Sequence, residues 1–201
     1  MEKGTRLRSA EDVFASPVTN APWVRAAINQ SLASSSINPI AFGNQFIIAK
    51  KKREILYRKG YTLPGKAAAL LAAEALSGIE HSQKLGGNIR KANPQTSRPP
   101  ETDAHHIVAS EASGARVSRT LIFAVGIGIN DADNGVILPR FKTTKIASMP
   151  NASPHQHIHT DIYHANVVAE LAGADDTSDA QELRGILRSI SGRLMRGQFV
   201  Y

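Results

Sequence analysis

The sequence contains no cysteine, few aromatic residues and no long hydrophobic run. Without cysteine there are no disulfides, no Cys-ligated zinc sites, no iron–sulfur clusters and no thiol nucleophile, so any metal site must use His, Asp, Glu or Asn. Aromatic residues make up 5%, too few for a large base-stacking surface. No segment approaches the roughly 18 consecutive apolar residues of a membrane-spanning helix, and Met1–Ala10 lacks the apolar stretch of a secretory signal.

The rest of the composition is that of an ordinary globular protein, with 201 residues, 42% of them hydrophobic and 20% charged. The net charge of +7 is unevenly distributed. The first hundred residues hold 15 Lys and Arg against 6 Asp and Glu, giving +9, whereas the remainder holds 9 against 11, giving −2. The densest basic run is Lys50–Arg53. This half is a candidate phosphate-facing surface, with a solvated helix face or a protein-docking surface as the alternative.

The composition changes again before residue 100. Gly86–Pro100 is rich in Gly, Asn, Pro and Ser, which predicts a linker and a domain boundary. We therefore divide the chain into a basic, mostly helical region, residues 1–95, and a second domain, residues 96–201. In the first region, apolar spacing and helix propensity predict helices over residues 21–33, 44–59 and 66–79.

The second domain alternates short strand-like runs with helical patterns. Short apolar runs predict strands at residues 104–109 and 135–138, the latter ending before Pro139. Apolar residues at helical spacing predict helices at 111–125, within 155–171 and at 179–195. The segment between the strands is long for a hairpin loop, so we expect the first of these helices to be inserted there. The predicted fold class is α+β, in a chain that is mainly helical.

Histidine is concentrated in the second domain, where six of the seven occur in two groups: His105 and His106, then His155, His157, His159 and His164. Histidines four positions apart lie on one face of a helical turn, so His155 and His159 can reach the same metal ion. A third ligand from a strand would leave coordination positions open, as catalysis requires. Adjacent histidines on a strand point to opposite faces, so His105 and His106 can take different roles.

Three motifs in this order carry a family resemblance. The first is Ala-His-His-Ile-Val over residues 104–108, the second runs from Gly128 to Pro139 and includes Asn134, and the third is His155-x-x-x-His159 followed by Thr160-x-x-Tyr163. Together they resemble the AHH family of HNH-type nucleases, which occur as toxin modules of bacterial polymorphic toxins and are often delivered by type VI or related secretion. The resemblance extends from about Glu101 to about Gly197 and leaves residues 1–95 without an assignment.

The resemblance implies a C-terminal ββα-metal core, in which a β-hairpin packed on a helix holds one divalent ion. By that pattern His105, His155 and His159 are metal ligands, His106 is the general base, and Asn134 holds the loop between the strands and helps to orient the base. A neutral His106 can take a proton from water, and the hydroxide then attacks phosphorus, giving 5′-phosphate and 3′-hydroxyl ends. The metal remains open among Mg²⁺, Mn²⁺, Ni²⁺ and Zn²⁺.

Other residues near the motifs have two interpretations each. Many HNH enzymes carry a second, Cys-bound zinc, which this chain cannot form. His157 and His164 are candidate substrate contacts or alternative ligands, with surface or packing roles as the other interpretation. Arg140, Lys142 and Arg116 are candidate nucleic-acid contacts, with solvated surface charge as the alternative.

The sequence therefore predicts a metal-dependent, largely sequence-nonspecific endonuclease acting on DNA. The resemblance implies an antibacterial effector, made in the bacterial cytoplasm without a signal peptide and delivered into a target cell's cytoplasm. Its implied partners are a cognate immunity protein and a secretion-system component or adaptor. We expect residues 1–95 to be a delivery or adaptor-binding segment, the remnant of a longer toxin, or a basic clamp that raises non-specific DNA affinity. The alternatives are an RNase of the same fold, or a non-catalytic nucleic-acid-binding protein whose histidines hold a structural metal and which would not need His106.

Overall fold

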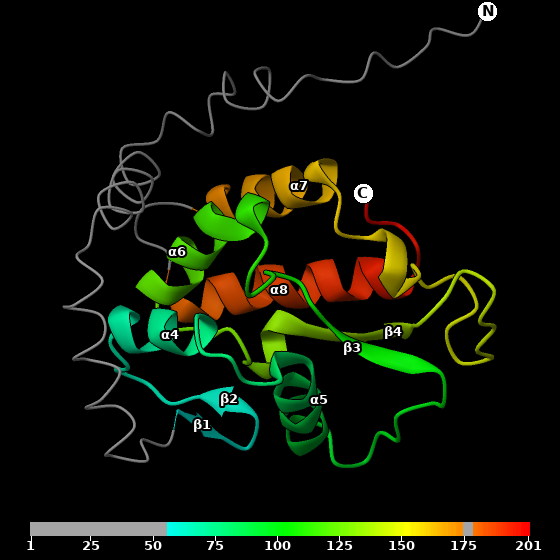
Figure 1. Ribbon diagram of the computed structural model, residues 1–201, viewed down its shortest axis with the longest axis horizontal. Helices are drawn as coiled ribbons and strands as arrows, with labels where there is room; N and C mark the ends of the chain where they lie inside the picture. Colours follow the sequence, from blue (N-terminus) through cyan, green and yellow to red (C-terminus); the bar gives the residue numbers. More distant parts are fainter. Residues whose placement is uncertain (1–55, 175–178) are drawn as a thin grey trace, which may run out of the picture.

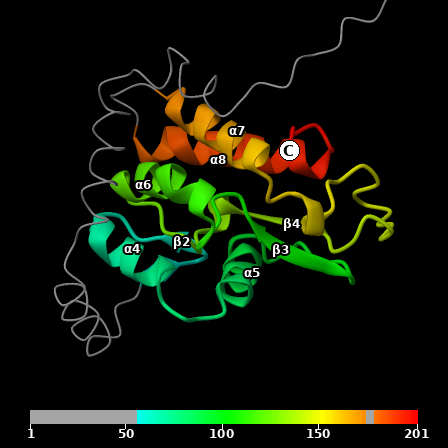
Figure 2. The same cartoon turned by 45° about the horizontal axis from the view of Figure 1, so that its top comes forward.

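A two-stranded antiparallel hairpin lies at the centre of the part of the chain that the computed structural model describes, residues 56–174 and 179–201 (Figure 1). Strand β3 (Thr102–His106) pairs with β4 (Gly135–Pro139), and the register aligns His106 with Gly135. Helix α5 (His81–Ala92) packs against one side of the hairpin and α8 (Ala180–Met195) against the other, as both views show (Figures 1 and 2).

The remaining elements surround this hairpin. A small hairpin precedes α5 in the sequence, and further helices lie on the α8 side of the molecule (Figure 2). The elements are β1 (Tyr57–Arg58), β2 (Tyr61–Thr62), α4 (Ala68–Ala75), α6 (Arg116–Ala124) and α7 (Asp161–Ala172), with 3₁₀ turns η2 (Ser113–Ala115), η3 (Ala132–Asn134) and η4 (His155–His157). Within the described ranges, every helix is too short or too polar to cross a bilayer.

Gly135 allows α5 to pack directly on the hairpin. A Cβ at this position would come within 2.7 Å of Leu85 Cδ1 and 2.8 Å of Ile89 Cδ1. Leu85 is fully buried, so its side chain has no free space into which it could move. Residues paired across an antiparallel sheet present their side chains on the same face. The side chain of His106, the partner of Gly135, therefore lies on the α5 face of the hairpin.

The opposite face carries the main apolar core, which α6, α7 and α8 share with the hairpin; its fully buried members include Ile107, Leu138, Leu171 and Leu187. Side-chain caps fix where two of these helices begin. The Thr160 hydroxyl accepts a hydrogen bond from the Tyr163 amide at 3.1 Å, and Asp179 caps α8 in the same way. Helix α7 therefore starts at Asp161, which places Tyr163 in its first turn, next to β3.

The structure confirms most of the elements expected for the second domain, and it confirms the α+β class. The expected strands correspond to β3 and β4, and the expected helices correspond to α6, α7 and α8. Helix α6 lies between the two strands in the sequence, as the long connection suggested. In the first region, the helix expected over 66–79 is α4, while the helix expected over 21–33 lies outside the described residues.

Two expectations for the first region are wrong where the structure describes it. The helix predicted over residues 44–59 does not extend to its end, because Tyr57–Arg58 forms β1 and the chain turns at Lys59 and Gly60, both with positive φ; residues 44–55 lie outside the described ranges. The first part of the predicted linker, residues 86–92, belongs to α5. Packing of this helix against β3 compensates for the low helix propensity of its two glycines.

The division of the chain at residue 95 stays a prediction. The part of the first region that the structure describes, residues 56–95, packs against the second domain through α5 and through α4, which contacts α6.

Candidate functional site

Three histidines from separate elements converge beside β3. His105 is in the strand, His155 is in η4 and His159 lies just before α7, and one ring nitrogen of each lies within 4.8 Å of the other two. The ring centroid of His105 is 5.1 Å from that of His155 and 4.7 Å from that of His159. The expectation that His155 and His159 share a turn of α-helix is wrong, because α7 begins only at Asp161. A 3₁₀ turn brings them together instead.

The tautomer of His105 follows from its one hydrogen bond. The Tyr163 hydroxyl donates to the Ile107 carbonyl at 2.9 Å, so it must accept from His105 Nε2–H at 3.0 Å. Burial raises the pKa of Tyr163, which keeps this hydroxyl protonated. His105 Nδ1 is left with its lone pair free; it is buried and has no hydrogen-bond partner. A buried nitrogen in this state is costly unless a ligand occupies it.

The charge state of the cluster also suits a cation. Burial and the neighbouring histidines hold the pKa of His105 well below its usual range, and desolvation together with His164 and His155 lowers the pKa of His159 to about 4. Both rings are therefore neutral near pH 7, as metal ligation requires. Three histidines that converge around one orphaned buried nitrogen fit a divalent ion such as Zn²⁺, Ni²⁺ or Mn²⁺, and open coordination positions would remain.

Asp103 lies next to His155 of the cluster. Its Oδ2 is 3.6 Å from His155 Nδ1, and the Arg140 guanidinium contacts both carboxylate oxygens, at 3.0 and 3.2 Å. Arg140 is the main cause of the lowered pKa of Asp103, which therefore remains ionised. A carboxylate facing Nδ1 favours the proton on that nitrogen and leaves Nε2 of His155 for a metal.

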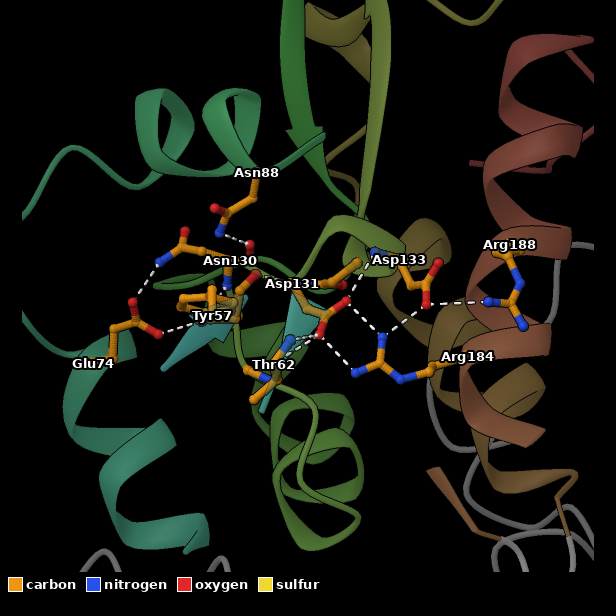
Figure 3. A network of polar contacts seen from close by, with 12 residues as sticks. Tyr57, Thr62, Glu74, Asn88, Asn130, Asp131, Asp133, Arg184 and Arg188 are labelled. Atoms are coloured by element: carbon orange, nitrogen blue, oxygen red, sulfur yellow. Dashed lines mark hydrogen bonds and ion pairs between the residues drawn. The ribbon is translucent and has the colours of Figure 1, made fainter. Parts of the chain in front are cut away.

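His106 lies on the other face of the strand, among residues from α4, α5 and the turn-rich segment before η3. Its Nε2 is 3.1 Å from Asn130 Oδ1, and its ring centroid is 6.3 Å from that of His81. Burial lowers the pKa of His106 to about 4. Asn130 is itself fully buried and its amide nitrogen donates to Glu74 Oε1 at 3.1 Å (Figure 3). A neutral His106 bonded through Nε2 keeps the lone pair of Nδ1 free for a proton.

A buried ion-pair network adjoins this face through the next residue. Asp131 is fully buried and receives two hydrogen bonds of 2.8 Å from the Arg184 guanidinium, while the Thr62 amide donates to it at 2.7 Å (Figure 3). Arg184 also contacts Asp133, which in turn contacts Arg188. These contacts tie α8 and β2 to the segment that carries Asn130.

Asn134 lies at the start of β4 and connects the two strands. Its Nδ2 donates to the carbonyls of Val108 and Ile129 at 3.1 and 2.8 Å, and its Oδ1 accepts from the Val108 amide at 2.8 Å. The side chain is fully buried. Asn134 thus holds the backbone that follows His106, whereas the amide in direct contact with the His106 ring is that of Asn130.

These motifs lie within the range covered by a known family. A sequence model of the AHH family, described as a nuclease family of the HNH/ENDO VII superfamily with conserved AHH, matches residues 87–193. The match covers just over half of the chain and includes all three motifs. The chain belongs to the AHH nuclease family. Searches among curated proteins and among solved structures gave no match.

The remaining predicted residues of this AHH nuclease, except His164, lie at its surface. Arg116, Arg140 and Lys142 are exposed, and Arg140 is already paired with Asp103. His157 is exposed in η4. His164 is buried, and its ring stacks on that of His159 with the centroids 5.7 Å apart, so it supports the histidine cluster through packing.

No sequence pattern indicated that Asn130, Glu74 and His81 surround His106. Asn130 was within a recognised motif but had no role, and Glu74 and His81 lie in the first region, where no motif was recognised. One signal was present: Glu74 is the only charged residue among the apolar residues of α4, and a lone carboxylate in such a helix is buried only when it has a partner.

Proposed function

We propose that this AHH nuclease is a metal-dependent endonuclease that hydrolyses phosphodiester bonds of DNA with little sequence preference. One observation carries the proposal. Consecutive residues of β3 present a buried, unpartnered nitrogen to a histidine cluster on one face and a neutral histidine with a free nitrogen on the other. Metal-assisted hydrolysis needs this combination of a ligand set and a separate base.

The ββα-metal unit in this proposal consists of β3, β4 and α7. His105, His155 and His159 would hold the divalent ion, which supplies Lewis-acid stabilisation of the charge on the scissile phosphate and the leaving oxygen. Asn134 keeps the two strands and the loop beyond His106 in place. Tyr163 and Asp103 fix the rings of His105 and His155 from behind.

His106 is the general base. Its Nδ1 accepts a proton from the attacking water, while Nε2–H stays bonded to Asn130 Oδ1. The water oxygen attacks phosphorus in line with the 3′ oxygen, the bond between phosphorus and that oxygen breaks, and the released 3′ oxygen takes a proton from solvent. The products are a 5′-phosphate and a 3′-hydroxyl.

The biological part of the proposal rests on the family resemblance. The protein is an antibacterial effector, exported with the help of a secretion-system component or adaptor and active in the cytoplasm of a target cell. A cognate immunity protein protects the producing cell. Expression in the bacterial cytoplasm should arrest growth with DNA loss, and expression of the His106→Ala variant should not.

A plasmid-nicking assay on the purified chain tests the enzymatic part. Supercoiled DNA is incubated with Mg²⁺, Mn²⁺, Ni²⁺ or Zn²⁺, then with a chelator, and in parallel with His106→Ala. Cleavage that depends on metal and on His106 supports the proposal. Faster cleavage of structured RNA than of duplex DNA would move the activity to RNA. Binding of nucleic acid without cleavage under any metal would refute catalysis and leave a binding protein with a structural metal.

A further inference from the structure

Every polar group of Asn130 has a partner. Its backbone amide donates to the Tyr57 hydroxyl at 3.1 Å and its backbone carbonyl accepts from Asn88 Nδ2 at 2.7 Å. Its side-chain oxygen is 3.1 Å from His106 Nε2, and its side-chain nitrogen is 3.1 Å from both Glu74 Oε1 and His81 Nδ1. The residue is fully buried, so each of these contacts substitutes for water. Figure 3 shows Asn130 between Glu74 and Asn88.

The partners of the side-chain nitrogen fix which way the amide points. The Ser77 carbonyl, 3.2 Å from His81 Nε2, can only accept, so His81 carries its proton on Nε2 and offers a lone pair at Nδ1. The Glu74 carboxylate offers only lone pairs as well. Both groups therefore require the NH₂ end of Asn130, whose two hydrogens they use.

The orientation of Asn130 then determines the tautomer of His106. With its NH₂ group directed to Glu74 and His81, Asn130 presents its carbonyl oxygen to His106. An amide oxygen only accepts, so His106 must carry its proton on Nε2 and leave Nδ1 free. A flipped amide would place its carbonyl oxygen opposite two other acceptors, Glu74 and His81 Nδ1, and would turn the NH₂ group to His106, which reverses the tautomer of His106.

Glu74 is itself firmly held. Lys84 Nζ forms an ion pair with its Oε1, and the Tyr57 hydroxyl donates to its Oε2. Burial and the neighbouring carboxylate raise the pKa of Tyr57, so the hydroxyl keeps its proton. Glu74 is 8% exposed, which limits competition from water.

We infer that Glu74 and His81 are positioning residues that set the proton of His106 on Nε2 through the side-chain amide of Asn130. Both precede residue 87, where the match to the AHH family begins. The working unit of this nuclease therefore includes residues of the first region, in α4 and α5, that the family match does not cover. The kinetic consequence rests on the proposed role of His106 as the base, whereas the tautomer itself does not.

Long-range proton–nitrogen NMR spectra of the histidine rings test the inference in the full chain, because they report which ring nitrogen carries the proton. Glu74→Gln is the main variant, since it keeps the shape of the side chain but allows it to donate to Asn130. Glu80→Gln is the matched control, because this exposed carboxylate has no hydrogen bond or ion pair within the described ranges. Metal affinity and steady-state DNA cleavage are measured on the same preparations.

The expected wild-type spectrum has the proton of His106 on Nε2, and Glu80→Gln leaves it unchanged. In Glu74→Gln a population with the proton on Nδ1 appears, and kcat falls about 10- to 100-fold with KM within about twofold, as for other groups that orient a functional histidine. Metal affinity stays at the wild-type value, because the histidine cluster is on the other face of β3.

Three results would overturn the inference: a wild-type His106 with its proton on Nδ1, an unchanged tautomer in Glu74→Gln, or equal kcat in the two variants. The wild-type spectrum decides even if Glu74→Gln does not fold. If the wild-type chain cuts no nucleic acid, the proposed function fails, but the comparison of tautomers still tests the role of Glu74.

Discussion

The two faces of β3 differ in how completely their polar groups are satisfied. On the His105 face, one hydroxyl holds the ring and a buried nitrogen is left without a partner. On the His106 face, Asn130 is bonded at all of its polar groups and connects His106 to Glu74 and His81. The first face has a ligand set that could hold an ion, whereas on the second face the bonds of Asn130 are complete and hold the ring of His106 in one state.

Removing each histidine of the pair separately gives the largest contrast. His106→Ala should lower the rate of DNA cleavage about 10²- to 10⁴-fold, the usual contribution of a general base, while the chain still binds metal with wild-type affinity. His105→Ala should lower both the cleavage rate and the metal affinity, because it would remove one of the three proposed ligands. Cleavage assays and metal titration calorimetry check this. A His106→Ala variant that cleaves DNA at a near wild-type rate would show that His106 is not the general base.

Acidification should destabilise the metal-free protein through the same residues. Burial lowers the pKa of His106 from 6.5 to about 4, so the unfolded state binds its proton first as the pH falls. The stability that His106 contributes is complete above pH 6.5 and is lost between 6.5 and about 4, amounting to about 3 kcal/mol. His105 acts in the same direction.

Urea unfolding in the presence of a chelator, at several pH values in this window, measures the effect. His106→Ala should weaken the pH dependence by up to one proton, whereas replacement of the exposed His157 by Asn should leave it unchanged. A pH dependence identical in wild type and His106→Ala would show that His106 is not held neutral by burial.

Tyr163→Phe should affect only the His105 face. Loss of the hydroxyl leaves His105 Nε2–H without an acceptor and releases its tautomer, so metal affinity should fall about 10-fold or more. Tyr61→Phe is the matched control, because Tyr61 is partly exposed and its hydroxyl makes no hydrogen bond with any described residue. Metal titration of both variants gives the comparison, and equal affinities would mean that Tyr163 does not orient the ligand.

The surface cations should give the smallest effects. Lys142→Ala and Arg116→Ala should each raise KM about two- to threefold and reduce the slope of affinity against salt by about one if the side chain contacts a phosphate. Arg140→Ala should also weaken metal binding, because it leaves Asp103, which faces His155, with Arg98 as its remaining arginine partner. Cleavage measured over a range of salt concentrations separates the two kinds of effect.

The sequence predicted the helices and strands whose residues follow a local pattern of apolar positions. Apolar spacing located α6, α7 and α8, and short apolar runs located β3 and β4. The alternation of side chains along a strand predicted that His105 and His106 would face opposite ways, as they do. The roles assigned to these two residues, and to Asn134, His155 and His159, stay predictions.

What the sequence could not predict depends on contacts between distant segments. Glycines at 86 and 87 predicted a linker, but packing on β3 keeps them in α5. His155 and His159 approach one another through a 3₁₀ turn, because the cap at Thr160 delays the start of α7. Glu74 lies 56 residues before its partner Asn130, a pairing that no short-range pattern reports.

The register of β3 against β4 has a consequence for how this chain can change. Because neighbouring residues of a strand alternate between faces, a single-residue insertion ahead of the Ala-His-His motif would turn each histidine to the opposite face of the hairpin. The Asn134 carbonyl and side chain bind the backbone at Ile107 and Val108 and so lock the alignment at its end. The fold should thus tolerate insertions and deletions in the mostly exposed stretch 141–148 but not within β3, where two adjacent histidines have different surroundings because they face opposite ways.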